Sequence, residues 1–337
     1  MKIFVTTAHN LRSLPVLLAA AAAALLASTG MAAGAEAAQT LDARISDGAL
    51  RVKGTAADDQ LTLRLRAGDT GVIELDVGDD GTADFAFQRA LAKEIRINAR
   101  AGDDLVRIDE ANGTIVEATV IQGGRGDDVL LGGSAVETMH GGPGDDFIDG
   151  NRANDVAFMG AGDDTFRWDP GDASDVVEGA GGNDTMLFNG ANGGESVDIS
   201  ANGERVTFFR QPGNIVMDLN DVETAAFVAL GGPDSIVVNE LTGTDVTNVD
   251  LNLDAGLGTG AGDGSTDLVM VLGTAGDDTI AVAGSTGNVS VSGLSAEVAI
   301  SAAEFANDQL NINTLGGDDT VDTSGLAAAV IQLFVDA

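Results

Sequence analysis

The 337-residue sequence contains no cysteine and no tyrosine, two histidines, and 17 Lys and Arg residues against 53 Asp and Glu residues. The absence of cysteine excludes disulfide bonds, zinc–thiolate sites and cysteine nucleophiles. The formal net charge of −36 makes nucleic acids unfavourable partners, because affinity for them depends on Lys and Arg that neutralise phosphates. The same shortage of Lys and Arg disfavours binding to an anionic membrane surface. Intrinsic disorder is disfavoured as well, since 44% of the residues are hydrophobic.

Basic residues are missing altogether from the last part of the chain. No Lys, Arg or His follows Arg210, although acidic residues continue to the C-terminus. These acids cannot be neutralised within their own segment. They are either solvated and far apart, or they are held by a cation from outside the chain.

Residues 1–37 have the pattern of a secretory signal peptide. Lys2 and Arg12 precede an apolar run at residues 14–27, and small residues with A-x-A cleavage patterns follow. The apolar run is shorter than the roughly 20 residues that span a bilayer. We therefore expect a secreted, extracellular protein that begins near residue 38 and has no integral membrane span.

The middle of the chain is an internal repeat of nine residues. Its blocks are GGRGDDVLL (123–131), GGSAVETMH (132–140), GGPGDDFID (141–149), GNRANDVAF (150–158), MGAGDDTFR (159–167), PGDASDVVE (170–178) and GAGGNDTML (179–187). The sixth place is always acidic and the eighth place is always apolar. Such a period is typical of a solenoid.

Each block predicts a turn followed by a very short strand. The first six places contain the Gly, Asp and Asn residues that turns require, and the last three alternate so that one side chain faces the core. Two blocks make an 18-residue coil, and stacked coils make an all-β, right-handed parallel β-helix or β-roll. Coils lie about 4.8 Å apart, so bare carboxylates in a column repel by roughly 1–3.5 kcal/mol per pair. Carboxylate and carbonyl oxygens are ligands that Ca²⁺ prefers, and this cation would remove the repulsion.

Residues 123–187 resemble the RTX, or haemolysin-type, calcium-binding repeat, whose consensus is G-G-x-G-x-D-x-(large apolar)-x. The resemblance implies a secreted β-roll that binds Ca²⁺ in the turns between successive coils. The odd-numbered blocks match the consensus well, and they supply the expected metal-binding residues Gly124, Gly126, Asp127, Asp128, Gly142, Gly144, Asp145, Asp146, Gly160, Gly162, Asp163, Asp164, Gly182 and Asp184.

The even-numbered blocks depart from the consensus. Ala replaces Gly at their fourth place, and one block has Glu137 in place of Asp. Their acids, Glu137, Asp155 and Asp175, are therefore expected to be weaker ligands. The repeat predicts an asymmetric roll, in which one edge is loaded with calcium and the other is poorly loaded or empty.

Weaker copies of the turn and strand recur on both sides of the repeat, at 54–65, 99–110, 230–240, 273–284 and 315–325. They suggest an N-terminal β-rich segment at 38–122, the nonapeptide roll at 123–190, and coils of a wider parallel β-helix at 191–337. Asp234, Asp278 and Asp319 are 44 and 41 residues apart, which suits about two wider coils with several short strands each. The strand-like end at 331–337 lacks a cap. Either the chain is truncated relative to longer relatives, or its open edge associates with a cell surface or a second copy.

Two further segments have patterns of their own. Residues 71–87 favour a β-hairpin around Gly78–Gly81. Asp76, Asp80 and Asp84 there hint at an EF-hand loop, but Phe87 occupies the place of the bidentate Glu. The glycine-rich stretch 254–267 predicts a loop that leaves the solenoid and holds either one additional ion, through Asp263 and Asp267, or none.

An enzymatic role is the alternative to a structural calcium-binding module. Parallel β-helices host polysaccharide lyases, epimerases and glycosidases, with calcium as a structural ion. The sequence contains neither an H-E-x-x-H zinc motif nor a G-x-S-x-G elbow. A lyase would need basic residues, and Arg64, Arg66, Arg96, Arg100 and Arg107 are the candidates. A pair of carboxylates could serve a glycosidase. We favour the non-enzymatic hypothesis.

Overall fold

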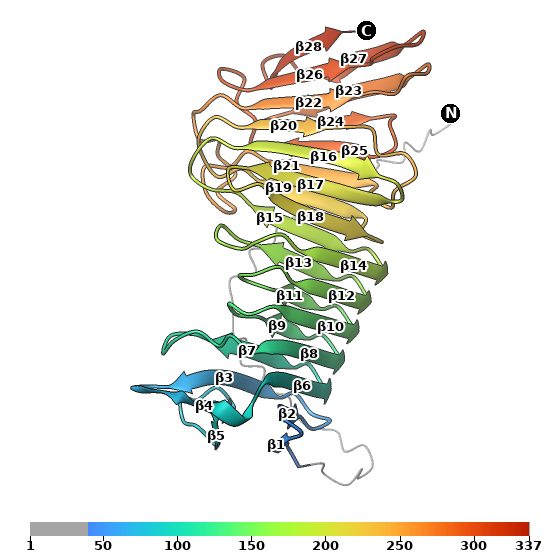
Figure 1. Cartoon of the computed structure of the whole chain (residues 1–337). Coiled ribbons are helices and arrows are strands. Elements are labelled where there is room, and N and C mark those ends of the chain that lie inside the picture. The colour runs from blue at the N-terminus through green and yellow to red at the C-terminus, as the bar shows by residue number, and fades with distance from the viewer. Residues whose placement is uncertain (1–39, 337) are drawn as a thin grey trace, which may run out of the picture.

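The computed structural model describes residues 40–336, and the expected signal peptide lies outside them. Twenty-eight strands form two long sheets that stack face to face along one solenoid (Figure 1). Sheet A contains β1 (Asp42–Ser46), β2 (Ala49–Lys53), β6 (Glu94–Ala101), β8 (Ala118–Arg125), β10 (Glu137–Pro143), β12 (Val156–Ala161), β14 (Val176–Gly181), β18 (Ile215–Asn220), β17 (Arg205–Gln211), β16 (Ser196–Asn202), β20 (Ser235–Val238), β22 (Leu268–Leu272), β26 (Gln309–Asn313) and β28 (Gln332–Asp336), in spatial order.

Sheet B has the same number of strands. In spatial order from the C-terminal end it contains β27 (Thr320–Leu326), β23 (Thr279–Ser285), β24 (Asn288–Ser292), β25 (Glu297–Ser301), β21 (Asn248–Asn252), β19 (Thr224–Val228), β15 (Thr185–Asn189), β13 (Thr165–Trp168), β11 (Phe147–Asp149), β9 (Val129–Leu131), β7 (Leu105–Asp109), β3 (Gln60–Arg66), β4 (Asp69–Val77) and β5 (Phe85–Gln88). One short 3-10 turn, η1 (Arg89–Leu91), precedes β6.

The nine-residue period sets the pairing of the central coils. Ile148 in β11 pairs with Leu130 of the preceding coil and with Phe166 of the following one, and each pairing is parallel. Odd blocks feed the strands of sheet B and even blocks feed those of sheet A. The expected all-β architecture with long parallel sheets is therefore confirmed. β8 itself extends across residue 123, where the sequence suggested the roll would begin.

The apolar eighth place of each block points between the sheets. Leu130, Met139, Ile148 and Phe166 are fully buried there. An aromatic cluster adds to this core and consists of Trp168, Phe188, Phe208 and Phe227. The ring centroids of Trp168 and Phe188 are 3.9 Å apart, and those of Phe188 and Phe208 are 4.6 Å apart. This continuous core runs through both sheets and needs no disulfide.

The long spacing of the C-terminal acids has a different origin from the one expected. β16, β17 and β18 form an antiparallel meander inside sheet A, and β23, β24 and β25 do the same inside sheet B. Extra length is therefore accommodated by antiparallel strands within two-sheet coils, and not by additional short parallel strands in wider coils. Asp278 and Asp319 precede neighbouring strands of sheet B, whereas Asp234 precedes a strand of sheet A.

The hairpin expected near residue 80 is present as the antiparallel pair β4 and β5. The carboxylate of Asp76 accepts the N–H groups of Asp80 and Gly81 and an Arg64 guanidinium bond of 2.6 Å. Among residues 40–336, no helix has the length and apolar character needed to cross a membrane.

Candidate metal centre

A column of acidic residues links the turns that enter sheet B. The backbone N–H of each residue donates to a carboxylate oxygen of the next coil, over distances of 2.7–2.9 Å. We call this column the inner ladder, and its members are Asp59, Asp104, Asp128, Asp146, Asp164, Asp184 and Glu223. Parallel stacking with a fixed register places these acids one above another.

A second column lies beside the first and runs in the opposite direction. The N–H of Asp145 donates to Oδ1 of Asp127 in the preceding coil at 2.9 Å. We call this column the outer ladder, and its members are Asp58, Asp103, Asp127, Asp145, Asp163 and Asn183. Each gap between two coils is therefore bounded by an outer-ladder carboxylate from the preceding coil and an inner-ladder carboxylate from the following coil.

The inner ladder is buried and its carboxylates are only half satisfied. Asp128, Asp146, Asp164 and Asp184 are at most 2% exposed, and the Oδ2 atom of each has no hydrogen-bond partner. Loss of solvation raises the pKa of Asp146 to about 7, opposed by the hydrogen bond from Asp128 and reinforced by neighbouring carboxylates. The same cause raises the pKa of Asp128 to about 6. A buried oxygen without a donor is costly, so these atoms indicate a missing positive ligand.

The glycines of the odd blocks let the coils approach closely at this edge. Gly142 and Gly144 have φ of +128° and +137°, a region that favours residues without Cβ. A methyl group on Gly144 would overlap the carbonyl oxygen of Gly126 and lie 3.0 Å from Oδ1 of Asp127. The carbonyl oxygens of Gly124 and Gly126 therefore face the next coil, on the same side as the outer carboxylate.

The turns that enter sheet A are built differently. Glu137 and Asp155 form a comparable ladder, since the N–H of Glu137 donates to Oδ1 of Asp155 at 2.7 Å. However, the gap is closed by protein donors: Asn151 Nδ2 donates to the carbonyl of Gly132 at 3.1 Å, and Arg152 N–H donates to the carbonyl of Gly133 at 2.9 Å.

The ladder at the sheet A turns is also partly satisfied from within. Glu137 Oε2 accepts the N–H of Gly133, whereas Asp155 Oδ2 has no hydrogen-bond partner. Burial raises the pKa of Asp175, the next member, to about 8. Both edges therefore contain buried carboxylate oxygens without a partner, and they differ in the Asn151 and Arg152 donors that close the gap at the sheet A turns.

Threonine satisfies the acids of two flanking turns. Thr55 N–H donates to Oδ2 of Asp59 at 2.6 Å, and Thr274 N–H donates to Oδ2 of Asp278 at 2.7 Å. Their hydroxyls bond the same carboxylates. Asp59 belongs to the inner ladder, and Asp278 donates its N–H to Oδ1 of Asp319 in a separate column. Neither acid has an unpaired oxygen, so neither requires a metal.

Several members of the columns were not chosen as site residues from the sequence. Asp103 and Asp104 extend both ladders by one coil, and Asp104 Oδ2 is buried and without a partner, like those of the repeat. The sequence signal that could have identified them is the pair of acids in the 99–110 motif. A further sheet A column contains Glu195, Asp234, Asp267 and Asp308. Asp263 and Asp267, the residues of the glycine-rich loop, accept the N–H groups of Gly232 and Asp234, respectively.

The oxygen set at the sheet B turns fits a hard cation. Within residues 40–336, no group of three or more His, Cys, Asp or Glu side chains is placed to hold a metal ion by itself. Carbonyl oxygens must therefore complete any such site. Ca²⁺ accepts six to eight oxygens and tolerates mixed carboxylate and carbonyl ligands, and the residues that would hold it between two coils are Gly124, Gly126, Asp127 and Asp146.

The arginines considered for an enzyme on the N-terminal coils are mostly engaged in ion pairs. Arg64 is paired with Asp76, and its pKa is raised mainly by that hydrogen bond. Arg66 is paired with Glu74 and Arg107 with Asp79. These contacts stabilise the β3–β4 region. Arg96 instead lies on the outer face of sheet A, paired with Glu94.

Comparison with known families agrees with the geometry. Residues 118–135 and 131–166 match the RTX calcium-binding nonapeptide repeat, in 4 copies. No curated protein matches the chain. The match includes the glycines at positions 124, 126, 142, 144, 160 and 162, and the repeat family binds calcium. The chain therefore contains RTX calcium-binding nonapeptide repeats, located in residues 118–166.

Proposed function

We propose that the chain is a secreted, structural calcium-binding module whose right-handed coils fold and stack when Ca²⁺ binds at the sheet B turns. The observation that carries this proposal is the series of buried Oδ2 atoms without a partner, on Asp104, Asp128, Asp146, Asp164 and Asp184. They occur once per coil along one edge. A cation shared by successive coils would satisfy them together.

Electrostatics explains why folding would depend on the ion. Each inner carboxylate gives up solvation when the coils stack, and desolvating an ion costs several kcal/mol. Its neighbours in the column have the same charge, so stacking without a cation forces the acids to repel or to take up protons. Bound calcium supplies positive charge between the coils and so favours the stacked state.

The net charge and the expected export are consistent with one another. With a formal charge of −36, the chain repels itself where calcium is scarce, as it is inside a cell. Outside, site affinities of about 10⁻⁴–10⁻³ M would be sufficient, and binding to the native state alone would stabilise it by mass action.

Calcium titration of the purified chain tests this proposal. We expect circular dichroism to show increased β-structure, and the unfolding temperature to rise, as calcium replaces a chelator. Mg²⁺ at the same concentration should have less effect, because it requires near-octahedral geometry and dehydrates reluctantly. A chain whose spectrum and unfolding temperature are the same in chelator and in calcium would refute calcium-coupled folding.

We also propose that the module is structural and not catalytic. Arg64, Arg66 and Arg107 are used in ion pairs, and His140 stacks on Phe158 with 4.9 Å between ring centroids. His140 itself lies within β10. Turnover of a uronic-acid polymer or a neutral glycan by the calcium-loaded chain would contradict this assignment.

A further inference from the structure

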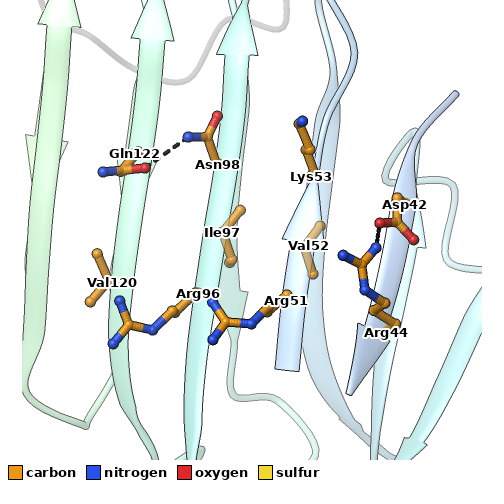
Figure 2. Close-up of a pocket in the computed structure, with 10 residues that line it drawn as sticks. All are labelled: Asp42, Arg44, Arg51, Val52, Lys53, Arg96, Ile97, Asn98, Val120 and Gln122. Carbon is orange, nitrogen blue, oxygen red and sulfur yellow. Dashed lines mark hydrogen bonds and ion pairs between the residues drawn. The ribbon is translucent and has the colours of Figure 1, made fainter. Parts of the chain in front are cut away.

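Basic side chains gather on the outer face of sheet A at its N-terminal end. They line a depression of ≈ 310 Å³, with Arg44, Arg51, Lys53 and Arg96 beside Asn98 and Gln122 (Figure 2). The rest of this chain is strongly acidic and has no Lys or Arg after Arg210. The concentration of positive charge here is therefore a local feature of the fold.

The strand register aligns three arginines in a row. Arg44 pairs with Arg51 across β1 and β2, and Arg51 pairs with Arg96 across β2 and β6. Like charges on neighbouring strands repel, so the row does not stabilise the sheet by itself. Two carboxylates offset part of the charge, since Asp42 pairs with Arg44 and Glu94 with Arg96.

Two of the four cations remain without an ion pair. Arg51 donates to the hydroxyl of Ser46 at 3.1 Å, and neither Arg51 nor Lys53 forms a salt bridge within the described part of the chain. Both lie at the solvent-facing surface of β2, with Lys53 exposed. This arrangement leaves a site for the carboxylates of an anionic ligand.

A second row on the same face has the chemistry of sugar recognition. Lys53, Asn98, Gln122, His140 and Phe158 occupy matching positions on five neighbouring parallel strands. Asn98 Nδ2 donates to Gln122 Oε1 at 2.7 Å, which leaves further amide donors and acceptors for hydroxyl groups. The stacked rings of His140 and Phe158, the latter 41% exposed, offer a flat apolar surface.

We propose that this strip, from Arg44 to Phe158 on the outer face of sheet A, binds a short acidic oligosaccharide. Uronate carboxylates bind at Arg51 and Lys53, hydroxyl groups bind at Asn98 and Gln122, and a sugar ring packs on Phe158. The strip spans five strand spacings, or about 24 Å. It ends where Glu178 follows Phe158 in the row, and together with the overall negative charge this limits the ligand to a short or terminal acidic segment.

Isothermal titration of the calcium-loaded chain with a uronate tetrasaccharide tests the proposal. Arg51→Gln with Lys53→Gln should weaken binding by about tenfold or more, as expected for the loss of charge-assisted hydrogen bonds. Lys93→Gln with Arg152→Gln removes the same charge from exposed positions outside the strip and should leave the affinity within about twofold of the original. Phe158→Ala should weaken binding of the tetrasaccharide while leaving that of inorganic phosphate unchanged.

The competing outcomes are distinguishable. Equal weakening in both double variants would show non-specific attraction, and equal binding of a neutral tetrasaccharide would remove the role of the cations. Inorganic phosphate that binds as tightly as the uronate would show a simple anion site. Absence of binding would also overturn the proposal. Calcium-dependent unfolding of every variant should match that of the original chain, which separates this test from that of the proposed function.

Discussion

The backbone N–H of Asp128 donates a hydrogen bond of 2.8 Å to Oδ1 of Asp146, one coil further along the solenoid. The second oxygen of Asp146 is buried without a partner. One carboxylate thus both aligns the coils and leaves an unmet requirement for positive charge. The consequences for stability can be measured with and without calcium.

Asp146→Asn should change stability in opposite directions under the two conditions. The amide oxygen can still accept the Asp128 N–H, and the buried charge is gone, so the unfolding temperature in chelator should rise. In calcium it should fall, because a carboxylate ligand is lost. Thermal unfolding followed by circular dichroism measures both changes.

Glu137→Gln is the matched control for Asp146→Asn. It makes the same exchange at a turn of sheet A, where Asn151 and Arg152 close the gap. The calcium-induced shift of this control should equal that of the original chain. A full calcium-induced shift in Asp146→Asn would contradict the assignment of the sheet B turns.

Without calcium, the chain should be more stable at pH 5 than at pH 8. The pKa values of Asp128 and Asp146 are raised to about 6 and about 7 in the fold, against about 3.9 for an unfolded Asp. The folded state therefore binds more protons in this window, and its stability falls as pH rises through the folded pKa values. Denaturant unfolding in chelator at several pH values measures this slope.

Saturating calcium should reverse or flatten that dependence. Protons compete with the cation for the same carboxylates, so acidification then removes stabilising ligands. The identical pH series in calcium is the comparison. Parallel slopes in chelator and in calcium would show that the ladder acids are not the ligands.

Gly144→Ala should destabilise the chain by at least about 1–2 kcal/mol, the usual cost of left-handed backbone for a residue with Cβ. Gly144 has φ of +137°, and an added methyl group would overlap Gly126 O. Gly193→Ala, where nothing lies within 4 Å of the added carbon, should change stability much less. Chemical denaturation in calcium compares the two, and equal effects would argue against close coil approach at the sheet B turns.

Phe188→Ala should cost about 3–5 kcal/mol in both chelator and calcium, as for other large-to-small core substitutions. Phe188 is fully buried and stacked between Trp168 and Phe208. Phe305→Ala, at a side chain that is 49% exposed, is the control. A loss that appeared only in calcium would connect the aromatic cluster to the metal sites, contrary to expectation.

The central coils could be predicted because each nine-residue block contains the whole pattern that specifies its turn and strand. Each block from residue 123 repeats its acid and its apolar residue at fixed places, and the eighth-place side chains are buried as that period requires. The inserted meanders could not be predicted in the same way. Val197–Ile199 of β16 and Val206–Phe208 of β17 alternate like any half-buried strand, and alternation does not reveal whether a neighbour is parallel or antiparallel.

The sequence predicted the glycines of the metal-binding turns, but it did not predict every contact around those turns. Gly124 and Gly126 identified the turns that enter sheet B, where both have positive φ. One contact could not be predicted from the pattern, because it depends on which turns stack together: the Asn151 amide donates to the Gly132 carbonyl across the opposite edge. Thr55, in contrast, satisfies Asp59 from four residues away within a single turn.

The two meanders are staggered along the solenoid. Where β16–β18 interrupt the parallel order of sheet A, sheet B continues through β15, β19 and β21. Where β23–β25 interrupt sheet B, sheet A continues through β20, β22 and β26. The antiparallel pairings of the two meanders therefore lie at different levels along the axis, so that parallel strands of the other sheet cover each interruption. We therefore expect that, under a pulling force along the axis, the two meanders do not form a common plane of separation.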